Sequence, residues 1–300
     1  MSSRYLGLDV GGTKCAAVVG TGEGRILHRV EWPADAQRGP DAMIGQMIAL
    51  ARPILQQHDI AAIGVSIGGP LDAQRGVILS PPNLPGWDNV PLRQRLETAL
   101  ERPVCVEHDG SACALAEWRW GVPDARRLIY LTCGTGFGMG LVVDGRIYRG
   151  AGGQPSDIGH IHYSDDGPIA YGRAGSLEAF AAGGALPRLA AWRFPQRWGA
   201  QPPTGARISQ LAADGDADAR QVIQLNAQAV GRACAMLIDL LYPDRISLGS
   251  LCLYLGAEWL AMVHQACEAH AMPGALACCR IAPAALEAKV QDLAPIAAAM

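Results

Sequence analysis

The stretch LGLDVGGTKCAAVV at residues 6–19 constrains the fold more than any other part of the chain. An apolar run ends at Asp9, two glycines and Thr13-Lys14 follow, and a second apolar run begins at Cys15. The residues of this second run are small or β-branched, which is typical of a strand and not of a helix. The common phosphate loop and the dinucleotide loop both open a helix, so neither describes this stretch. The sequence predicts a β-hairpin with a glycine–threonine turn.

The same pattern returns near residue 133, where the run RLIYLTC is followed by Gly134-Thr135-Gly136 and by further apolar residues. Strands are predicted in two sets, at residues 5–9, 15–20 and 24–32 and at residues 127–133, 139–143 and 146–149. In the second set, Asp144-Gly145 predicts a hairpin turn. Two such sets predict two structurally similar α/β lobes. Because no charged or Ser-rich linker separates them, we expect the lobes to pack closely around a cleft.

The remaining elements follow from hydrophobic periodicity and from proline and glycine. Helices are predicted at residues 40–58, 92–101, 111–121 and 219–242. Further strands are predicted at residues 61–67, 104–107 and 245–248, the last of these being the final strand. The segment at residues 71–92 is so rich in Pro, Gly and Asn that no regular element is expected there.

Composition excludes several classes of protein. Half of the 300 residues are hydrophobic, which predicts a folded globular chain, and the net charge of −3 gives no electrostatic footprint for nucleic acid or an anionic membrane. No uninterrupted apolar stretch reaches the roughly 18–20 residues of a membrane span, and no signal peptide is recognised. The nine cysteines are scattered without C-x-x-C spacing. They predict reduced thiols and a cytoplasmic location.

The two glycine–threonine turns are the first candidate binding elements. Each can present backbone N–H groups and a hydroxyl to phosphate oxygens, because glycine lets the main chain approach a ligand closely. Asp9, at the end of a strand, can hold a hydrated Mg²⁺. Either turn alone is as well explained as an ordinary hairpin turn, whereas one turn in each lobe favours a nucleotide bound between the lobes.

Other polar residues have a structural interpretation beside the functional one. Asp109 stands between a strand and a helix, where spacing alone favours a helix N-cap over a general base. The segment at residues 157–166 holds several His and Asp residues, but its spacing favours a solvated loop over a metal site. Glu178 is equally explained as a charge in the first turn of a helix, and Asn83 as a turn residue.

Taken together, these stretches resemble the ROK family of sugar kinases, repressors and open reading frames, within the actin-like ATPase superfamily. The stretches that carry the resemblance occur in the family's order over residues 6–183, with RISLGS further along, and are LGLDVGGTK, GVSIGGPLD, SPPNLPGWDNVPL, VEHDGSACALAE, YLTCGTGFGMGLVVDGRIYRGAGG, DIGHI and GSLEAFAAG. The resemblance implies a two-lobed, ribonuclease H-like α/β fold with a cleft between the lobes. We expect the N-terminal lobe at residues 1–112, completed by a C-terminal helix at about 288–300, and the second lobe at residues 113–287.

The resemblance also implies an ATP-dependent sugar kinase that uses Mg²⁺. Asp109 would be the general base that activates a sugar hydroxyl. The residues around ATP would be Asp9, Gly11, Gly12, Thr13, Lys14, Gly134, Thr135, Gly136 and Gly249, with Asp9 reaching Mg²⁺ through water. The residues that line the sugar pocket would be Gly69, Asn83, His108, Asp157, His160 and Glu178. The substrate would be a hexose or an amino or keto sugar, with ATP favoured over polyphosphate as donor.

Three departures from the family pattern stand out. His108 occupies the position before the base where the family usually has Asn, and Asp157 occupies that of a Glu. The family's zinc loop carries three cysteines, whereas Ile169, Tyr171 and Ser176 stand at those positions here. No zinc site is therefore expected. We expect hydrophobic packing around Ile169 and Tyr171 in its place.

Two other functions belong to the same family. A catalytically weak sugar-binding or regulatory protein is the main alternative, because the departures affect the sugar pocket. A DNA-binding repressor is not expected, because such repressors carry a helix-turn-helix before the first phosphate motif and this chain is acidic. Members of the family are often dimers, and the resemblance leaves monomer and homodimer open.

Overall fold

The first hairpin forms as the sequence predicts. The computed structural model describes residues 3–300. Strands β1 (Arg4–Val10) and β2 (Lys14–Thr21) pair antiparallel, with Val10 opposite Cys15 across the turn. All of β2 after Lys14 is buried, which explains why this run holds no charge. The glycine–threonine turn thus lies at one end of a buried hairpin.

Three further strands, of which β3 is antiparallel to β2, extend this hairpin into the first sheet, whose order is β3-β2-β1-β4-β8. Its other members are β3 (Ile26–Pro33), β4 (Ile60–Ile67) and β8 (Val104–His108). Strands β1, β4 and β8 are parallel, and Val10, Ile67 and His108 lie in register at their carboxyl ends. In open α/β sheets, ligands bind at this edge. The loops that follow these strands therefore carry the candidate residues of this sheet.

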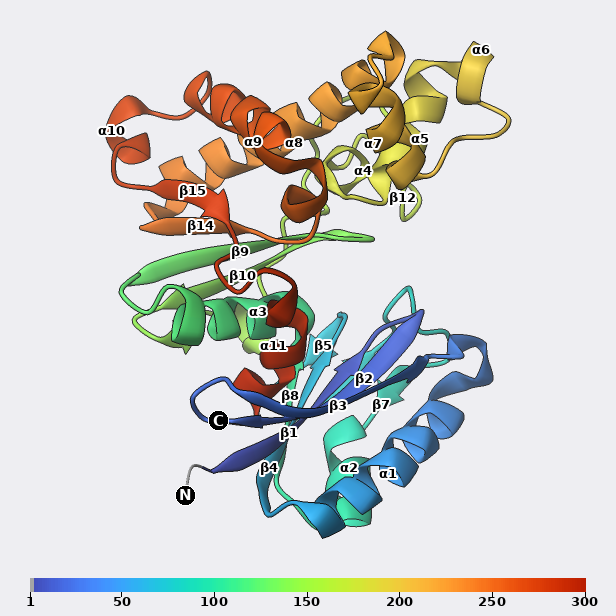
Figure 1. The fold of residues 1–300 in the computed structure, drawn as a ribbon, viewed down its shortest axis with the longest axis vertical. Helices are drawn as coiled ribbons and strands as arrows, with labels where there is room; N and C mark the ends of the chain where they lie inside the picture. The colour runs from blue at the N-terminus through green and yellow to red at the C-terminus, as the bar shows by residue number, and fades with distance from the viewer. Residues whose placement is uncertain (1–2) are drawn as a thin grey trace. The chain divides into compact units, whose positions relative to one another are not determined.

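Helices cover both faces of the first sheet (Figure 1). They are α1 (Gly39–Gln57), α2 (Leu92–Leu100), α3 (Asp109–Ala116) and α11 (Val290–Ala298). Helices α1 and α2 lie on one face and α3 and α11 on the other (Figure 1). Gly7 and Gly64 are in register on β1 and β4, and a Cβ on either would collide with Pro295 of α11. The glycines let the C-terminal helix lie directly on the sheet.

The second sheet repeats the strand order of the first, as β11-β10-β9-β14-β15. Its strands are β9 (Arg127–Cys133), β10 (Phe137–Val143), β11 (Arg146–Ile147), β14 (Arg245–Leu248) and β15 (Arg280–Pro283). In both sheets three consecutive strands are followed by two that pair in parallel, here β9 with β14 and β14 with β15. The repeat predicted from the two glycine–threonine turns is therefore present in the topology.

Helices form much of the chain after residue 176. They are α4 (Leu177–Ala181), α5 (Ala185–Arg193), α6 (Pro195–Trp198), α7 (Gly205–Ala213), α8 (Ala217–Leu241), α9 (Leu251–Glu268) and α10 (Pro273–Leu276). Helices α8 and α9 lie side by side (Figure 1), and a Cβ on Gly231 of α8 would fall 2.6 Å from Ala266 Cβ of α9. The long predicted helix at residues 219–242 is α8, displaced by only one or two residues.

The chain divides into two compact units. Unit 1 comprises residues 1–124, 140–156 and 288–300, and unit 2 comprises residues 125–139 and 157–287. Strand β10 begins in unit 2 and continues into unit 1. Across residues 3–300, none of the helices combines the length and the apolar character that a membrane crossing needs. All nine cysteines are free thiols.

Three expectations about secondary structure were wrong. The segment at residues 71–92 is not irregular, because β5 (Leu71–Asp72), β6 (Val77–Leu79) and β7 (Asp88–Val90) form a small sheet there. Buried Leu71 and Ile78 anchor it. Strand β14 is not the last strand, since β15 pairs with it in parallel. The helix predicted at residues 111–121 begins earlier, at Asp109, and continues as a π-helix over Glu117–Gly121.

Candidate active site

The candidate residues fall into two sets, one in each unit, and each set is described by itself. The set in unit 1 is Asp9, Gly11, Gly12, Thr13, Lys14, Gly69, Asn83, His108 and Asp109. The set in unit 2 is Gly134, Thr135, Gly136, Asp157, His160, Glu178 and Gly249.

The first glycine–threonine turn lies against the loop that carries Asn83. The Gly11 amide donates to the Lys14 carbonyl at 3.1 Å and closes the turn. A Cβ on Gly12 would come within 2.7 Å of the Asn83 carbonyl oxygen, so only glycine allows the two loops to approach this closely. Gly12, Thr13 and Lys14 are exposed. Their position leaves backbone N–H groups and a hydroxyl accessible to a ligand.

Asp9 is the last residue but one of β1, close to this turn, and carries an unusual carboxyl group. Burial raises its pKa to about 7, and the negative charges of Asp109 and Asp292 add to the effect. A hydrogen bond from Ser66 and the charge of Lys14 act in the opposite direction. Two carboxylates near a partly buried third one create a local excess of negative charge. A cation is the ligand that this arrangement favours.

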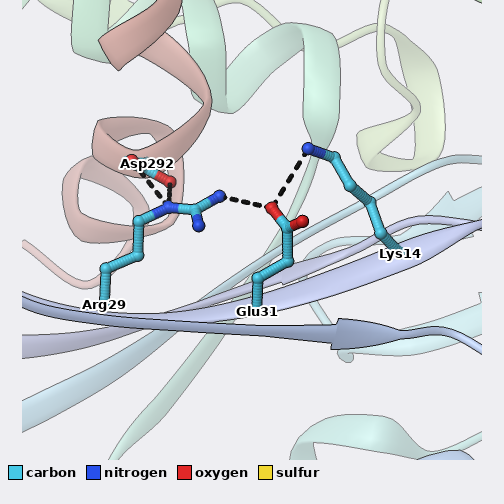
Figure 2. Close-up of polar contacts among 4 residues, drawn as sticks. All are labelled: Lys14, Arg29, Glu31 and Asp292. Atoms are coloured by element: carbon cyan, nitrogen blue, oxygen red, sulfur yellow. Dashed lines mark hydrogen bonds and ion pairs between the residues drawn. The ribbon is translucent and has the colours of Figure 1, made fainter.

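Lys14 belongs to a chain of ion pairs that Figure 2 shows. Its Nζ lies 3.1 Å from Glu31 Oε2, and the same oxygen accepts from Arg29 at 2.6 Å. Arg29 Nε in turn lies 2.8 Å from Asp292 Oδ1 on α11. The Lys14 side chain is 55% exposed, so this pairing is a surface interaction of small energy. Glu31 thus holds Lys14 without burying its charge.

Asp109 and His108 lie at the carboxyl end of β8, beside the loop after β4. Asp109 is the first residue of α3, and its Oδ1 accepts from the amide of the next residue, Gly110, at 2.6 Å. The N-cap interpretation that spacing favoured is wrong, because the N-cap residue is His108 and makes no capping hydrogen bond. About half of the Asp109 side chain is exposed. A Cβ on Gly69 would lie 3.0 Å from His108 Cδ2, so Gly69 borders the imidazole.

Glu107 and Arg149 form an ion pair that sequence analysis missed. Glu107 Oε1 accepts the His108 backbone N–H at 2.9 Å, and its Oε2 pairs with the Arg149 guanidinium. The Glu107 side chain is buried, and both residues belong to unit 1. The pair fixes the backbone immediately before Asp109. Only the position of Glu107 next to His108 in the sequence pointed to it.

In unit 2, Glu178 bonds directly to the second glycine–threonine turn. Its Oε2 accepts the Phe137 amide hydrogen at 3.0 Å, and a Cβ on Gly136 would lie 2.7 Å from the same oxygen. At the start of the turn, the Gly134 carbonyl accepts from the Gly184 amide at 3.0 Å. Thr132 Oγ1 accepts from the Gly138 amide at 2.9 Å. The turn is therefore held at both ends, and Thr135 at its tip is exposed.

Asp157 and His160 lie in a loop that packs against the start of α4. The Glu178 amide donates to the Gly159 carbonyl at 2.9 Å, and Asp157 Oδ1 accepts from the Gly159 amide at 2.8 Å. His160 Nε2 lies 3.7 Å from Asp157 Oδ2, with both side chains about half exposed. Burial raises the pKa of Glu178, while the Phe137 hydrogen bond and the charges of His160 and Arg188 oppose this. The structure thus brings these three sequence-predicted residues together.

Gly249 directly follows β14 and packs against β9. Its amide donates to the Leu131 carbonyl at 2.9 Å, and a Cβ there would collide with the Tyr130 hydroxyl. The next residue, Ser250, has its Oγ 3.9 Å from where a Cβ on Gly134 would be. Ser250 therefore lies beside the second turn, a contact that the stretch RISLGS alone did not reveal.

The segment at the family's zinc loop does not fit zinc. Ser176 Oγ caps α4 by accepting from the Ala179 amide at 3.3 Å, and no thiolate stands nearby in sequence. Within residues 3–300, no group of three or more His, Cys, Asp or Glu is placed to hold a metal ion. The expected packing around Ile169 and Tyr171 was wrong, because these side chains are 64% and 45% exposed. Tyr163, Phe180 and Trp192 form the aromatic cluster of this region instead.

The sequence of this chain is similar to those of known proteins. A family model described as the ROK family matches residues 5–292. The glucokinase of Halalkalibacterium halodurans is 32% identical over 292 residues, covering 91% of this chain and 88% of the relative. The N-acetylmannosamine kinase of Salmonella paratyphi B is 34% identical over 234 residues, covering 77% of each chain.

A solved structure of a ROK family protein has a similar fold. A ROK family glucokinase from Streptomyces griseus, solved in complex with glucose and AMPPNP, superposes with a TM-score of 0.84. It is 27% identical, and the match covers 99% of each chain.

Proposed function

Because the chain belongs to the ROK family, we propose that it is a carbohydrate kinase that transfers a phosphoryl group from Mg-ATP to a sugar hydroxyl. The substrate class is a hexose or an amino or keto sugar, since glucokinases and N-acetylmannosamine kinases are both among its relatives. The AMPPNP complex of the Streptomyces griseus glucokinase supports ATP as the donor.

The observation that carries the proposal is the position and hydrogen bonding of the Asp109 carboxylate. It lies at the carboxyl end of a parallel strand, half exposed, with Oδ1 bonded to Gly110. Within residues 3–300, no donor is bonded to Oδ2. A carboxylate oxygen with a free lone pair at a ligand-binding edge is what a general base needs.

In the proposed reaction, Asp109 accepts the proton of the sugar hydroxyl as that oxygen forms its bond to the γ-phosphorus. The electron pair of the broken P–O bond leaves with ADP. Bound Mg²⁺ would supply charge neutralisation at the phosphates. Asp9 fits this ion, because a carboxylate with a raised pKa in acidic surroundings favours a hard cation with oxygen ligands.

The roles of the other site residues are also proposed. Backbone amides of the two glycine–threonine turns and the Lys14 ammonium would bind phosphate oxygens. Asn83, His108, Asp157, His160 and Glu178 would bind sugar hydroxyls, which both donate and accept hydrogen bonds. Gly69 would leave room for the sugar, and Gly249 for the nucleotide. A homodimer and a cytoplasmic location also stay proposals, the first to be tested by light scattering.

The test is a coupled ADP-release assay over a panel of sugars with ATP and Mg²⁺. The wild-type chain is expected to turn over at least one hexose or amino sugar. Asp109→Asn is expected to lower kcat by at least about a thousandfold while calorimetry still detects sugar binding. Sugar binding without turnover in the wild type would favour the alternative, a regulatory sugar-binding protein. Near-normal turnover of Asp109→Asn would remove Asp109 as the base.

A further inference from the structure

We propose that His108 is a positioning residue that holds Oδ1 of Asp109 through its Nε2–H and so leaves Oδ2 as the basic oxygen. This inference rests on the proposed function, because it assumes that Asp109 is the base. It assigns His108 a role toward a protein side chain, beyond the sugar contact proposed above.

The first observation is the place of the imidazole. His108 Nε2 lies 3.4 Å from Asp109 Oδ1, and only 16% of the His108 side chain is exposed. A Cβ on Gly69 would lie 3.0 Å from His108 Cδ2 and 3.4 Å from Nε2. The ring therefore lies between Asp109 and Gly69, and a side chain on residue 69 would displace it.

The second observation identifies which ring nitrogen carries the proton. His108 Nδ1 is buried and has no hydrogen-bond partner within residues 3–300. A buried N–H without an acceptor is rarer in proteins than a buried acceptor without a donor. We therefore assign the unprotonated ring position to Nδ1 and the hydrogen to Nε2. Nε2 is also the ring nitrogen that lies near Asp109, at 3.4 Å from Oδ1.

The third observation is that the two oxygens of Asp109 have different surroundings. Oδ1 accepts from the Gly110 amide at 2.6 Å and has His108 Nε2 as its second neighbour. Oδ2 has neither. The 3.4 Å separation is long for a hydrogen bond, and such contacts in ligand-free sites shorten when substrate binds. His108 therefore limits rotation of the carboxylate and keeps Oδ2 toward the substrate side.

The backbone of His108 is fixed independently of its ring. Glu107 Oε1 accepts the His108 N–H at 2.9 Å, and Glu107 is paired with Arg149. A substitution of the ring leaves these backbone contacts in place. The effect of the imidazole can therefore be measured apart from the fold of this segment.

The experiment compares His108→Gln with His108→Met. The Gln amide nitrogen is as many bonds from Cα as His Nε2 and donates a hydrogen bond, whereas Met has similar length and no donor. We expect the Met variant to lose about 10–100-fold in kcat, as for a misoriented catalytic group, with a smaller change in KM for the sugar. The kcat of the Gln variant should be at least about tenfold higher than that of the Met variant. Equal losses in the two variants, or no loss in Met, would overturn the inference.

A double-mutant cycle tests the same contact without removing the ring. Gly69→Ala should displace the imidazole and lower kcat, and combining it with His108→Met should add little further loss. Fully additive losses would argue against the inference. Thermal unfolding of each variant separates misfolding from these effects. The Asp109→Asn variant separates the two proposals. If Asp109→Asn is inactive and His108→Met is fully active, only the role of His108 is refuted. If Asp109→Asn is active, Asp109 is not the base.

Discussion

Glu178 Oε2 accepts the backbone hydrogen of Phe137 at 3.0 Å, which joins a proposed sugar residue to the proposed phosphate turn of unit 2. The same oxygen leaves no room for a side chain on Gly136. One buried carboxylate therefore sets the shape of the turn and lies next to the loop of His160. Glu178 has a structural role that its position in the first turn of α4 does not indicate.

Glu178→Gln is expected to change the pH dependence of stability. The folded-state pKa of Glu178 is raised above 4.5, so its stabilising contribution is full below that pH and is lost as the pH rises through the folded-state pKa. The Gln variant has no such loss, and its amide oxygen can still accept from Phe137. Urea unfolding should show the variant at least as stable as wild type at pH 7, with the difference disappearing near pH 4.

Glu178→Ala is the control for this prediction. It leaves the buried Phe137 N–H without an acceptor, which costs about 1–3 kcal/mol. Both variants should raise KM for the sugar. A Gln variant that is less stable than wild type at pH 7 by as much as the Ala variant would contradict the raised pKa.

Gly136→Ala is expected to disturb the second turn from within. Its new Cβ would lie 2.7 Å from Glu178 Oε2, so either the carboxylate or the turn must move. We expect a loss of about 1–3 kcal/mol, as for overpacking, and a rise in KM for ATP. Gly134→Ala is the matched control for stability, because its Cβ meets nothing nearer than Ser250 Oγ at 3.9 Å. Equal unfolding midpoints for the two variants would show that the contact with Glu178 does not constrain the turn.

Local periodicity was enough to predict the elements on which the site is built. The strands at residues 127–133 and 245–248 match β9 and β14 residue for residue, because each is a short apolar run that ends at a glycine turn or loop. The two glycine–threonine turns also predicted the repeated topology, since each reads as one hairpin followed by further strands. These features depend on neighbours in the sequence, which are visible before folding.

Features that depend on distant partners could not be predicted in this way. Strand β15 has four residues and exists because it pairs in parallel with β14, more than thirty residues earlier. The hydrogen bond of Glu178 reaches across 41 residues to Phe137, and no local pattern indicates which amide a carboxylate will accept from. The small sheet β5-β6-β7 forms in a segment of low strand propensity because Leu71 and Ile78 are buried by tertiary packing.

Asp9→Asn is expected to separate nucleotide-linked metal binding from folding. Asp9 is the proposed site of hydrated Mg²⁺, and Asn keeps its shape without the charge that binds the ion. In thermal unfolding, Mg²⁺ with ADP should raise the Tm of wild type and raise that of the variant much less, because at a fixed ligand concentration weaker binding to the folded state stabilises it less. ADP without metal is the control and should affect both proteins equally. Equal stabilisation of both by Mg-ADP would remove Asp9 from the metal site.

Lys14→Met is expected to affect nucleotide binding and to leave stability nearly unchanged. The Lys14–Glu31 pair is exposed, and such pairs contribute about 1 kcal/mol or less, so urea unfolding should show only a small loss. If the ammonium binds phosphate, KM for ATP should rise at least about tenfold, the loss of one charge-assisted interaction of 1.5–3 kcal/mol. Arg38→Met is the matched control, because it removes another exposed ion pair of unit 1, with Asp35, and carries no proposed role. An equal change in the KM for ATP in both variants would mean that Lys14 makes no specific contact with ATP. Its pairing with Glu31, drawn in Figure 2, would then be its only specific interaction.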